Sequence, residues 1–561
     1  MRSKTSRKGL PAGREAIFSW SNVGMKIWLS FLVAAALLPA QFTEEHVAKA
    51  RAKGEQYHAA VSAADRLLHA WLKQADPVTL LLPDHTNRPE RVYRPHNSGA
   101  DLYPYLLLTA HLTAPEIYSG RMMDMLRNEI RYTSHPNGLP GNYDLIKQEL
   151  GPPSMFGAAE YAKDGLLAVT ERLGRTPWYY RMADLTAAAM HAAEVETDFG
   201  RLPAKDSEVN GEMLQNLVRM AAMTGDGRYL QWVRRLGDAY IREVLPRNNG
   251  LPAMVWDFKA HTGDGKIKLR DHGNEIVVGL MLHFALESDL EGERSVHYRP
   301  VLAKMLDQIL ASANPHGMLY NTIDTKTLKP VDERLSDNWG YVYGAMYTFY
   351  QATGEEKYRD AVRRVLKNLG NYRNYAWEPS GNARTKELGS FDGYADSLES
   401  ALYLISREPV PEAMDWIDSE MKVMLGMQRA DGQVEDWYGE GNFNRTALLY
   451  ADWKSEGVHP VRWEKGLKVG SVRAGDRLLV SLQGRPGWRG AVRFDVARHR
   501  RWLNFRKNYV RLNEFPEYFV VDENTLYRVA RRNGSEEQVR LGSELAAGVE
   551  LGLGEWVVEK R

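Results

Sequence analysis

Carboxylates, amides and aromatic rings occur together at several points in the chain, each at the start of a stretch with helical periodicity. These residues are Glu208 and Glu212; Asp271, His272 and Glu275; Asp337, Asn338, Trp339 and Tyr341; Asp392, Tyr394 and Asp396; and Trp437, Tyr438, Glu440, Asn442 and Arg445. Asp and Asn are common helix N-caps, so capping is the simpler interpretation of each acid taken alone. The aromatic neighbours favour more than capping, because Trp and Tyr rings stack on sugar rings whose hydroxyls bind to carboxylates and amides.

Two carboxyl groups can cleave a glycosidic bond when one donates a proton and the other, ionised, attacks carbon or activates water. Asp337 and Asp271 are the first candidates, because they begin neighbouring helices. Glu275 lies one turn beyond Asp271 on the same helix face, so the charge of one would keep the other protonated. Asp396 is a further catalytic candidate. The other residues named above are expected to bind substrate, and which acid donates the proton stays open.

The elements that must position these residues are pairs of helices. Loops that contain Gly-Leu-Pro, at 138–140 and 250–252, separate the helix pairs. Gly225 and Gly354 are expected to end the first helix of two pairs as C-caps. The first helices are expected near Asp101, Met155, Ser207, Asp271, Ser336 and Phe391, and their partners near Pro115, Pro177, Arg228, Val296, Glu355 and Pro411. From Met155 onward the spacing is roughly 50–65 residues, which predicts six hairpins. Two further helices, near 55–74 and 443–455, either form a seventh pair or brace the ends.

The first helices are apolar on almost all sides and the second helices are amphipathic, as 340–347 and 358–369 show. Buried inner helices and amphipathic outer helices predict two concentric rings, an (α/α)6 toroid, over residues 41–460. The alternative is an open helical solenoid, which would need no ring closure. Short β-type runs between Gly, Pro and Asn turns predict a β-sandwich over residues 461–561. If the toroid closes, the leading acids of distant helices converge at one end.

The number of hairpins, the Thr-Gly-Asp/Glu-x-x-Tyr joints and the Gly-Leu-Pro returns resemble the six-hairpin glycosidases. These include unsaturated glucuronyl hydrolases and related exo-acting glycuronidases, and several polysaccharide lyases have the same toroid followed by a β-sandwich. The resemblance covers the architecture from about Asp101 to Trp453. It implies a carbohydrate substrate and catalytic Asp or Glu at the N-termini of inner helices.

The function expected from the sequence is therefore a glycoside hydrolase that acts on a polysaccharide or oligosaccharide, including one with uronic acid, by Asp/Glu acid–base catalysis. One alternative is a polysaccharide lyase, which removes the proton at C5 of a uronate with a Tyr or His base. Tyr341, Tyr438, His272 and Arg445 could supply its parts. The other alternative is a non-catalytic glycan-binding protein in which the acids only cap helices.

The N-terminal residues predict export. Met25-Lys26 precedes the apolar run Ile27–Leu38, which is followed by Pro39-Ala40. A positive start, a short apolar core and a small residue at the end are typical of a secretory signal peptide, and the run is too short to span a membrane. We expect residues 1–40 to be an upstream extension and a signal peptide, and the mature protein to be periplasmic or extracellular. The alternative is a buried N-terminal helix.

Composition excludes several other classes. The chain has 561 residues, a formal net charge of +1 and no cysteine, which argues against a nucleic-acid binder and excludes disulfides, Cys-ligated metal and a thiol nucleophile. No metal-ligand or phosphate-loop motif is present, so we expect no cofactor and no dedicated metal site; the alternative is a Ca²⁺ ion bound by loop carboxylates. The basic segment 485–511 either attracts an acidic polysaccharide or, as we favour, has a structural role, as a solvated face of the β-domain or as its contact with the toroid.

Overall fold

The computed structural model describes residues 42–378 and 389–561, without the side chains of Asp271 and His272. The predicted extension and signal peptide, 1–40, lie outside the described residues. Residues Phe42–Arg561 form one compact unit.

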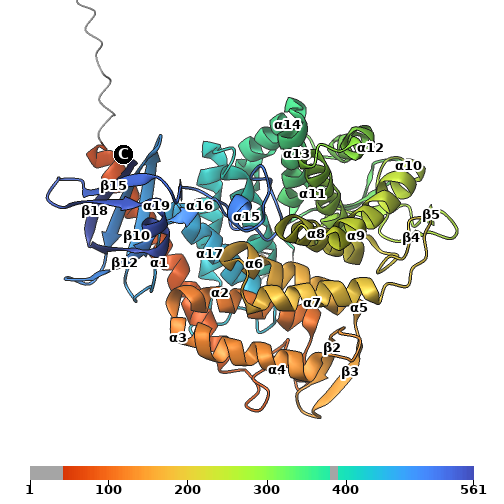
Figure 1. The fold of residues 1–561 in the computed structure, drawn as a ribbon, viewed down its shortest axis with the longest axis horizontal. Helices are drawn as coiled ribbons and strands as arrows, with labels where there is room; N and C mark the ends of the chain where they lie inside the picture. Colours follow the sequence, from red (N-terminus) through yellow and green to blue (C-terminus); the bar gives the residue numbers. More distant parts are fainter. Residues whose placement is uncertain (1–41, 379–388) are drawn as a thin grey trace, which may run out of the picture. The chain divides into compact units, whose positions relative to one another are not determined.

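Seven helical segments pack side by side in a closed ring in the described part of the chain, with α17 against α2 (Figure 1). They are η1–α2 (Pro95–Leu102, Tyr103–Thr113), α5–η3–α6 (Met155–Glu160, Tyr161–Leu166, Leu167–Leu173), α8 (Ser207–Thr224), η5–α11 (Asp271–Asn274, Glu275–Asp289), α13 (Trp339–Thr353), α15 (Phe391–Ile405) and α17 (Glu440–Ser455). These segments are almost entirely buried, as the apolar pattern predicts. The ring closure excludes the open solenoid.

An outer helix follows each of the first six inner segments and packs against it. The outer layer is α3–η2–α4 (Pro115–Ile117, Tyr118–Met122, Met123–Thr133), α7 (Pro177–His191), α9–η4–α10 (Gly227–Asp238, Ala239–Val244, Leu245–Arg247), α12 (Glu293–Ala311), α14 (Glu356–Asn368) and α16 (Pro411–Gly426). The six predicted hairpins and the toroid are thus confirmed. The long helix α1 (Glu44–Leu72) packs on α17, so the two ends of the helical region form the seventh pair that the sequence left open.

The hairpin joints depend on glycines with left-handed backbone. Gly225 ends α8 with φ 67° and Gly354 ends α13 with φ 78°, a conformation that costs glycine little and other residues more. The next helix begins within a few residues, which keeps each inner–outer pair antiparallel. The longer return segments therefore all lead to the N-terminal ends of inner helices.

Three small sheets stiffen these return segments. They consist of β1–β2–β3 (Val92–Tyr93, Gly141–Asp144, Glu149–Pro153), β4–β5 (Trp256–Asp257, Thr262–Gly263) and β6–β7–β8 (Lys266–Lys268, Tyr320–Asp324, Pro330–Leu335). The last sheet joins the return before α11 to the return before α13, because β6 pairs antiparallel with β7.

The C-terminal part is β-rich, as predicted, and begins at β9 (His459–Pro460), next to the expected boundary. A five-stranded antiparallel sheet has the order β10–β11–β18–β15–β16, and a three-stranded sheet has the order β17–β12–β9. The strands are β10 (Lys468–Ala474), β11 (Arg477–Gln483), β12 (Arg489–Arg493), β13 (Asp495–Val496), β14 (Val520–Val521), β15 (Leu526–Arg531), β16 (Glu537–Leu541), β17 (Val549–Gly552) and β18 (Gly554–Lys560), with short helices α18 (Arg498–Arg501) and α19 (Gly542–Ala547). The β-type runs of the sequence did not include β9, β10 and β17, of which β10 and β17 contain glycines and charged residues.

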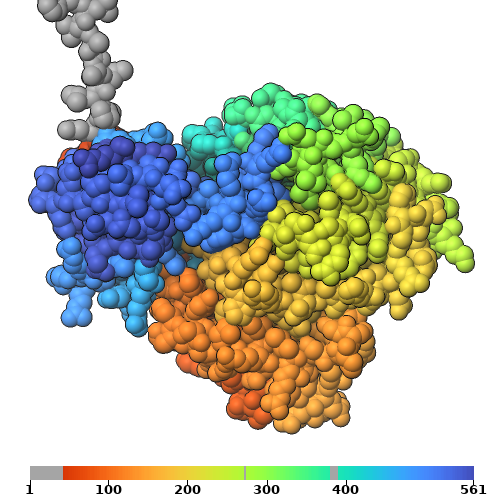
Figure 2. All heavy atoms as spheres, viewed as in Figure 1, coloured from red at the N-terminus to blue at the C-terminus, as the bar shows by residue number. Residues whose placement is uncertain are grey.

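Residues 497–517, which we call the plug segment, run from the β-rich part across the C-terminal ends of inner helices. Backbone carbonyls of the plug segment accept hydrogen bonds from Arg219 of α8 and Thr348 of α13, and Tyr509 donates one to Asp289 of α11. Figure 2 shows a lobe of the blue C-terminal part between the green and yellow parts of the toroid. Arg498 and Arg511 are buried here, which supports the structural interpretation of this part of the basic segment.

Among the described residues, no helix combines the length and the apolar character that crossing a membrane requires.

Candidate active site

Each inner segment of the ring places polar side chains on the inside of the toroid, toward the N-terminal ends of the helices. Lys163 of η3 reaches Glu275 of α11 at 2.6 Å although α8 lies between those two segments. The charge of Asp101 in η1 likewise acts on Asp392 of α15 across α17. We call the set the axial cluster: Asp101, Glu160, Lys163, Asp164, Glu212, Gln215, Glu275, Tyr341, Asp392, Asp396, Glu399, Asn442 and Arg445. Ring closure therefore brings the expected residues Glu212, Glu275, Tyr341, Asp392, Asp396, Asn442 and Arg445 into one centre.

Two π-helical segments position three of the residues that the sequence analysis missed. Asp101 lies in η1, and Lys163 and Asp164 lie in η3, where the wider turn changes the direction of side chains relative to an α-helix. The start of α17 packs directly on η1, since a Cβ at Gly441 would lie 1.7 Å from the carbonyl oxygen of Asp101. Only glycine permits this approach, which brings the first turn of α17 to the axial cluster.

On one side of the cluster, Lys163 holds two carboxylates. Its Nζ lies 2.6 Å from Glu275 and 2.5 Å from Asp164, and Gln215 donates a 2.5 Å hydrogen bond to the other oxygen of Glu275. Burial, opposed by Lys163, raises the pKa of Glu275 to about 7, and the charges of Asp164 and Glu212 add to the rise. Burial also raises the pKa of Glu160 well above its usual value, with Asp164 and Glu212 as further causes. This side therefore combines carboxylates bound by Lys163 with acids whose pKa is raised.

On the other side, Arg445 holds two acids of α15. Its guanidinium lies 2.5 Å from Asp396 and 2.9 Å from Glu399, and Tyr341 donates a 2.5 Å hydrogen bond to Glu399. Asp392, one turn before Asp396, accepts a 3.0 Å hydrogen bond from Asn442. Its surroundings are mostly protein, so burial raises the pKa of Asp392 well above its usual value, and the charge of Asp396 raises it further. The raised pKa of Asp392 favours its protonated form beside a carboxylate that Arg445 neutralises.

Solvent access separates the aspartates of the cluster from its glutamates. Glu160, Glu212, Glu275 and Glu399 are buried. Asp101, Asp164, Asp392 and Asp396 are all partly exposed, with 15% of the side chain accessible for Asp164 and 17% for Asp396. A ligand that enters from the N-terminal side of the ring would therefore meet aspartates first.

Two aromatic rings stand beside this region at the start of α17. Trp437 and Tyr438 are partly exposed, their ring centroids are 5.1 Å apart, and the indole nitrogen of Trp437 donates to Glu435. A pocket of about 270 Å³ is lined by His85, Asn87, Arg88, Glu378, Ser390, Glu435 and Trp437. Ser390 is the N-cap of α15, so this rim pocket adjoins the helix that carries Asp392 and Asp396. Both rings are accessible at the rim of the site, and their role in sugar stacking stays a prediction.

The structure places Asp337 differently from the leading expectation. Asp337 is 1% exposed. Its carboxylate forms an ion pair with Arg270 at 3.1 Å and accepts a 3.0 Å hydrogen bond from the backbone N–H of Asn338. Asn338 in turn accepts a 3.1 Å hydrogen bond from Asn274. These contacts tie the starts of α11 and α13 together and leave Asp337 little access to a substrate. Asp271 and His272 lie in η5, and their side chains are outside the described residues.

Three further expected ligands are core residues. Trp339 and Tyr394 are 0% exposed, and the indole of Trp339 donates to Ser397, so neither ring is available for stacking on a substrate. Glu440 is also fully buried and accepts hydrogen bonds from Trp71 and from the backbone of 434–436, so it organises the turn before α17. Glu208 is partly exposed in the first turn of α8, one turn before Glu212.

The sequence analysis missed Asp101, Glu160, Lys163, Asp164, Gln215 and Glu399 as members of the cluster. Their signal was present, because charged and polar residues stood inside helices that are otherwise apolar on all sides. His85, Asn87 and Arg88 gave no comparable signal, since they lie in an irregular segment. In the described part of the chain, Asp101, Glu160 and Asp164 each offer a carboxylate oxygen within 4.8 Å of the others, a spacing that could hold a cation. The expectation of no metal site stays a prediction.

The raised pKa of Glu275 predicts a pH-dependent contribution to stability. Between the pKa of an unfolded Glu, about 4.5, and about 7, the folded state keeps a proton that the unfolded state loses, so the free energy of unfolding falls as the pH rises. Glu275→Gln removes this dependence. We expect wild type to lose stability relative to Glu275→Gln between about pH 5 and pH 8 in urea denaturation. An unchanged difference across this interval would show that Glu275 does not titrate there.

The fold and the site define an α/α-toroid protein with an acidic centre inside the ring. No family model and no curated protein matches the chain. Cellobiose 2-epimerase from Spirochaeta thermophila DSM 6192 aligns at 12% identity over 67% of this chain and 99% of its own, with a TM-score of 0.43. The α-1,6-mannanase from Salegentibacter sp. HEL1_6 aligns at 13% identity over 58% and 96%, with a TM-score of 0.41.

The unsaturated glucuronyl hydrolase from Bacillus sp. GL1 aligns at 11% identity over 53% of this chain and 85% of its own, with a TM-score of 0.38. Likeness at this level carries no argument about the reaction. The chemistry must therefore be argued from the residues of this chain.

Proposed function

We propose that the protein hydrolyses a glycosidic bond, with Asp392 as proton donor and Asp396 as its ionised partner. The observation that carries the proposal is the pair of aspartates on α15. They lie one turn apart, both are partly exposed, and their surroundings favour opposite charge states. Two carboxyl groups whose environments separate their proton affinities are the arrangement that acid–base cleavage of a glycoside uses.

In this mechanism, Asp392 donates its proton to the leaving oxygen while positive charge develops on the sugar ring. The partly exposed carboxylates Asp101, Asp164 and Asp396 supply the negative field that stabilises this charge. Arg445 and Lys163 keep Asp396 and Asp164 ionised and hold them in place. Asp396 then attacks carbon or activates water.

The charge of the cluster favours an uncharged sugar over a uronate. Among the described members of the axial cluster, the cations are Lys163 and Arg445, and each already contacts two carboxylates. A uronate carboxylate inside the cluster would therefore approach several anions, while both cations of the cluster are already engaged. The same contacts disfavour elimination, in which a cation must neutralise the uronate, and the buried Tyr341 already donates to Glu399.

We also propose that the protein is exported, on the strength of the short apolar run Ile27–Leu38 after Met25-Lys26. The polymer substrate that we infer would be met outside the cytoplasm. Expression of the full chain, followed by N-terminal sequencing of the periplasmic and medium fractions, tests this. Recovery of only the uncleaved chain in the cytoplasm would contradict it.

The test of the reaction is product analysis on a panel of neutral, amino-sugar and uronate polysaccharides and oligosaccharides. We expect new reducing ends from a neutral glycan without ultraviolet absorbance from a new double bond. Absorbance that appears with a uronate polymer would establish elimination instead. Binding of glycans without any product would establish the non-catalytic alternative.

The rim aromatics predict a binding defect that differs from a catalytic one. Trp437→Ala removes a partly exposed ring from the rim pocket, and loss of one stacking contact should raise KM by about 3- to 10-fold with a smaller change in kcat. Initial rates over a range of substrate concentrations measure this. Tyr320→Ala, at a partly buried tyrosine of β7 outside the rim pocket, is the matched control and should leave KM unchanged. A loss confined to kcat in Trp437→Ala would argue against a stacking role.

A further inference from the structure

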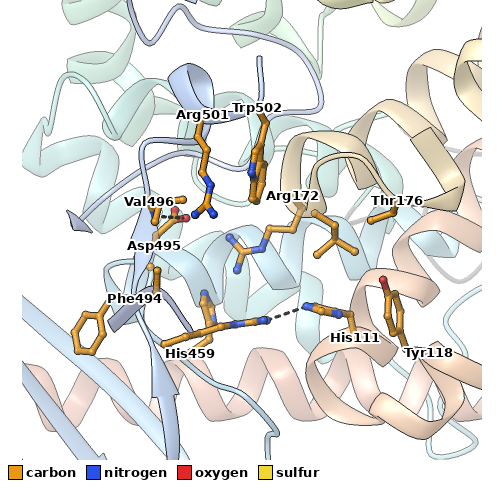
Figure 3. A pocket seen from close by; sticks show the side chains of 14 residues that line it. His111, Tyr118, Arg172, Thr176, His459, Phe494, Asp495, Val496, Arg501 and Trp502 are labelled. Atoms are coloured by element: carbon orange, nitrogen blue, oxygen red, sulfur yellow. Dashed lines mark hydrogen bonds between the residues drawn. The ribbon is translucent and has the colours of Figure 1, made fainter. Parts of the chain in front are cut away.

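A second cavity lies at the other end of the helices, where the toroid meets the β-rich part. It has a volume of about 270 Å³ and is lined by His111 of α2, by Arg172 of α6, and by Arg493, Arg501 and Trp502 of the β-rich part. We call it the junction pocket. Figure 3 shows Arg172 reaching into it from the toroid and Arg501 from the β-rich part, with Trp502 beside them. Asp101 and His111 are ten residues apart on the same helical segment, about 15 Å, so the junction pocket is separate from the axial cluster.

Most charged groups around the junction pocket are already matched. The carboxylate of Asp452 lies 2.9 Å from the guanidinium of Arg172 and 2.6 Å from the imidazole of His459. Asp495 forms an ion pair with Arg498 at 2.8 Å, and Arg501 forms one with Glu523 at 2.9 Å. These contacts occupy the carboxylates that line or adjoin the pocket.

Arg493 is the exception. No described carboxylate lies within ion-pair distance of its guanidinium, and its one described hydrogen bond joins it to Nε2 of His111 at 3.0 Å. To accept this bond, His111 must be neutral with its lone pair on Nε2. Burial, together with the charges of Arg493 and Arg172, lowers the pKa of His111 to about 3, so His111 adds no charge. Among the described residues, the guanidinium groups around the pocket therefore outnumber the carboxylates that form ion pairs with them by one.

The excess positive charge is unfavourable because it is largely removed from water. Burial and the neighbouring charge of Arg172 lower the pKa of Arg493 to about 10. A charge removed from water without a partner costs free energy, which an anion at hydrogen-bond distance would recover. Guanidinium groups bind phosphate, sulfate and carboxylate oxygens through several hydrogen bonds at once.

We propose that the junction pocket is a binding site for an oxyanion, held by Arg493 together with Arg172. The anion is free phosphate or sulfate, or the acidic group of a sugar whose ring lies on Trp502. The Trp502 indole is partly exposed and contacts the position where Gly174 has no side chain, so its ring closes one wall. Because the walls come from the toroid and from the β-rich part, bound anion should stabilise their junction.

Thermal unfolding and calorimetry of the full chain test the proposal, with phosphate, sulfate and chloride compared at constant ionic strength. We expect phosphate and sulfate, but not chloride, to raise Tm in a saturable way. Arg493→Gln should weaken phosphate binding at least about tenfold. The matched control Arg489→Gln lies on the same strand, is 53% exposed and pairs with Glu536 outside the pocket, and it should bind as wild type does. Equal weakening in both variants would overturn the site.

Two further experiments distinguish a free oxyanion from an acidic sugar. The second uses only the wild type, so it does not depend on whether a variant folds. Glucuronate and glucose 6-phosphate are compared with phosphate: tighter binding that Trp502→Ala abolishes assigns a sugar acid, and equal binding assigns the oxyanion alone. Crystals of the wild type soaked in selenate should show anomalous density within hydrogen-bond distance of Arg493. Selenate found only elsewhere, with no saturable shift in Tm, would refute the proposal.

Discussion

Replacement of Asp392 by Asn is expected to lower kcat on the cleaved glycan by at least about 100-fold while the protein folds as before. Asn cannot donate the proton that the leaving oxygen needs. It has the shape of the protonated acid and keeps an oxygen that can accept from Asn442, so the local structure should persist. Steady-state rates and the melting temperature of wild type and variant measure the two effects separately. Asp396→Asn should lose activity as well, because it removes the ionised partner.

The pH profile distinguishes a proton donor from a merely structural residue. Because Asp392 must be protonated to act, and because its pKa is raised, the wild-type rate should fall only when the pH rises through that high value. Any residual activity of Asp392→Asn should not show this fall in rate at high pH. Asp360→Asn, at a 69% exposed acid on α14, is the control and should match wild type. Full activity of Asp392→Asn would exclude Asp392 as the acid.

Loss of the charge network beneath the toroid should have the largest effect on stability. Glu171 forms ion pairs with Arg219 at 2.9 Å and with Arg511 at 3.0 Å. All three side chains are at most 1% exposed. Arg511 also lies 3.2 Å from Glu514, which pairs with Arg407 at 2.6 Å. Arg511→Met leaves buried carboxylates with one cation fewer, so we expect the free energy of unfolding to fall by about 3–5 kcal/mol.

Denaturant unfolding of purified variants measures this loss. Arg506 lies in the same plug segment but is 60% exposed and pairs with Glu291 at the surface, so Arg506→Met should change stability by less than about 1 kcal/mol. A similar small change in Arg511→Met would show that the network contributes little. A change in activity without a change in stability would mean that the plug segment acts on the axial cluster instead.

Local pattern was sufficient for much of the fold. Helix periodicity, the prolines at 115, 177 and 411 and the glycine caps at 225 and 354 predicted the hairpins, because each signal acts within a few residues. The β-rich end was predicted from its turns, but three of its strands, β9, β10 and β17, were missed. The seventh pair stayed open because α1 and α17 lie at opposite ends of the helical region.

The sequence by itself placed acids at the N-termini of inner helices, and this determined where the candidate site would form. It did not determine which acids are available. Asp337 and Asp392 have similar local patterns, yet Asp337 is buried against Arg270, whereas Asp392 is partly exposed beside Asp396. Burial and proton affinity depend on partners far away in the chain, such as Lys163 for Glu275 and Arg445 for Asp396. Only ring closure creates these contacts, so the tertiary structure decided which carboxyl groups can do chemistry.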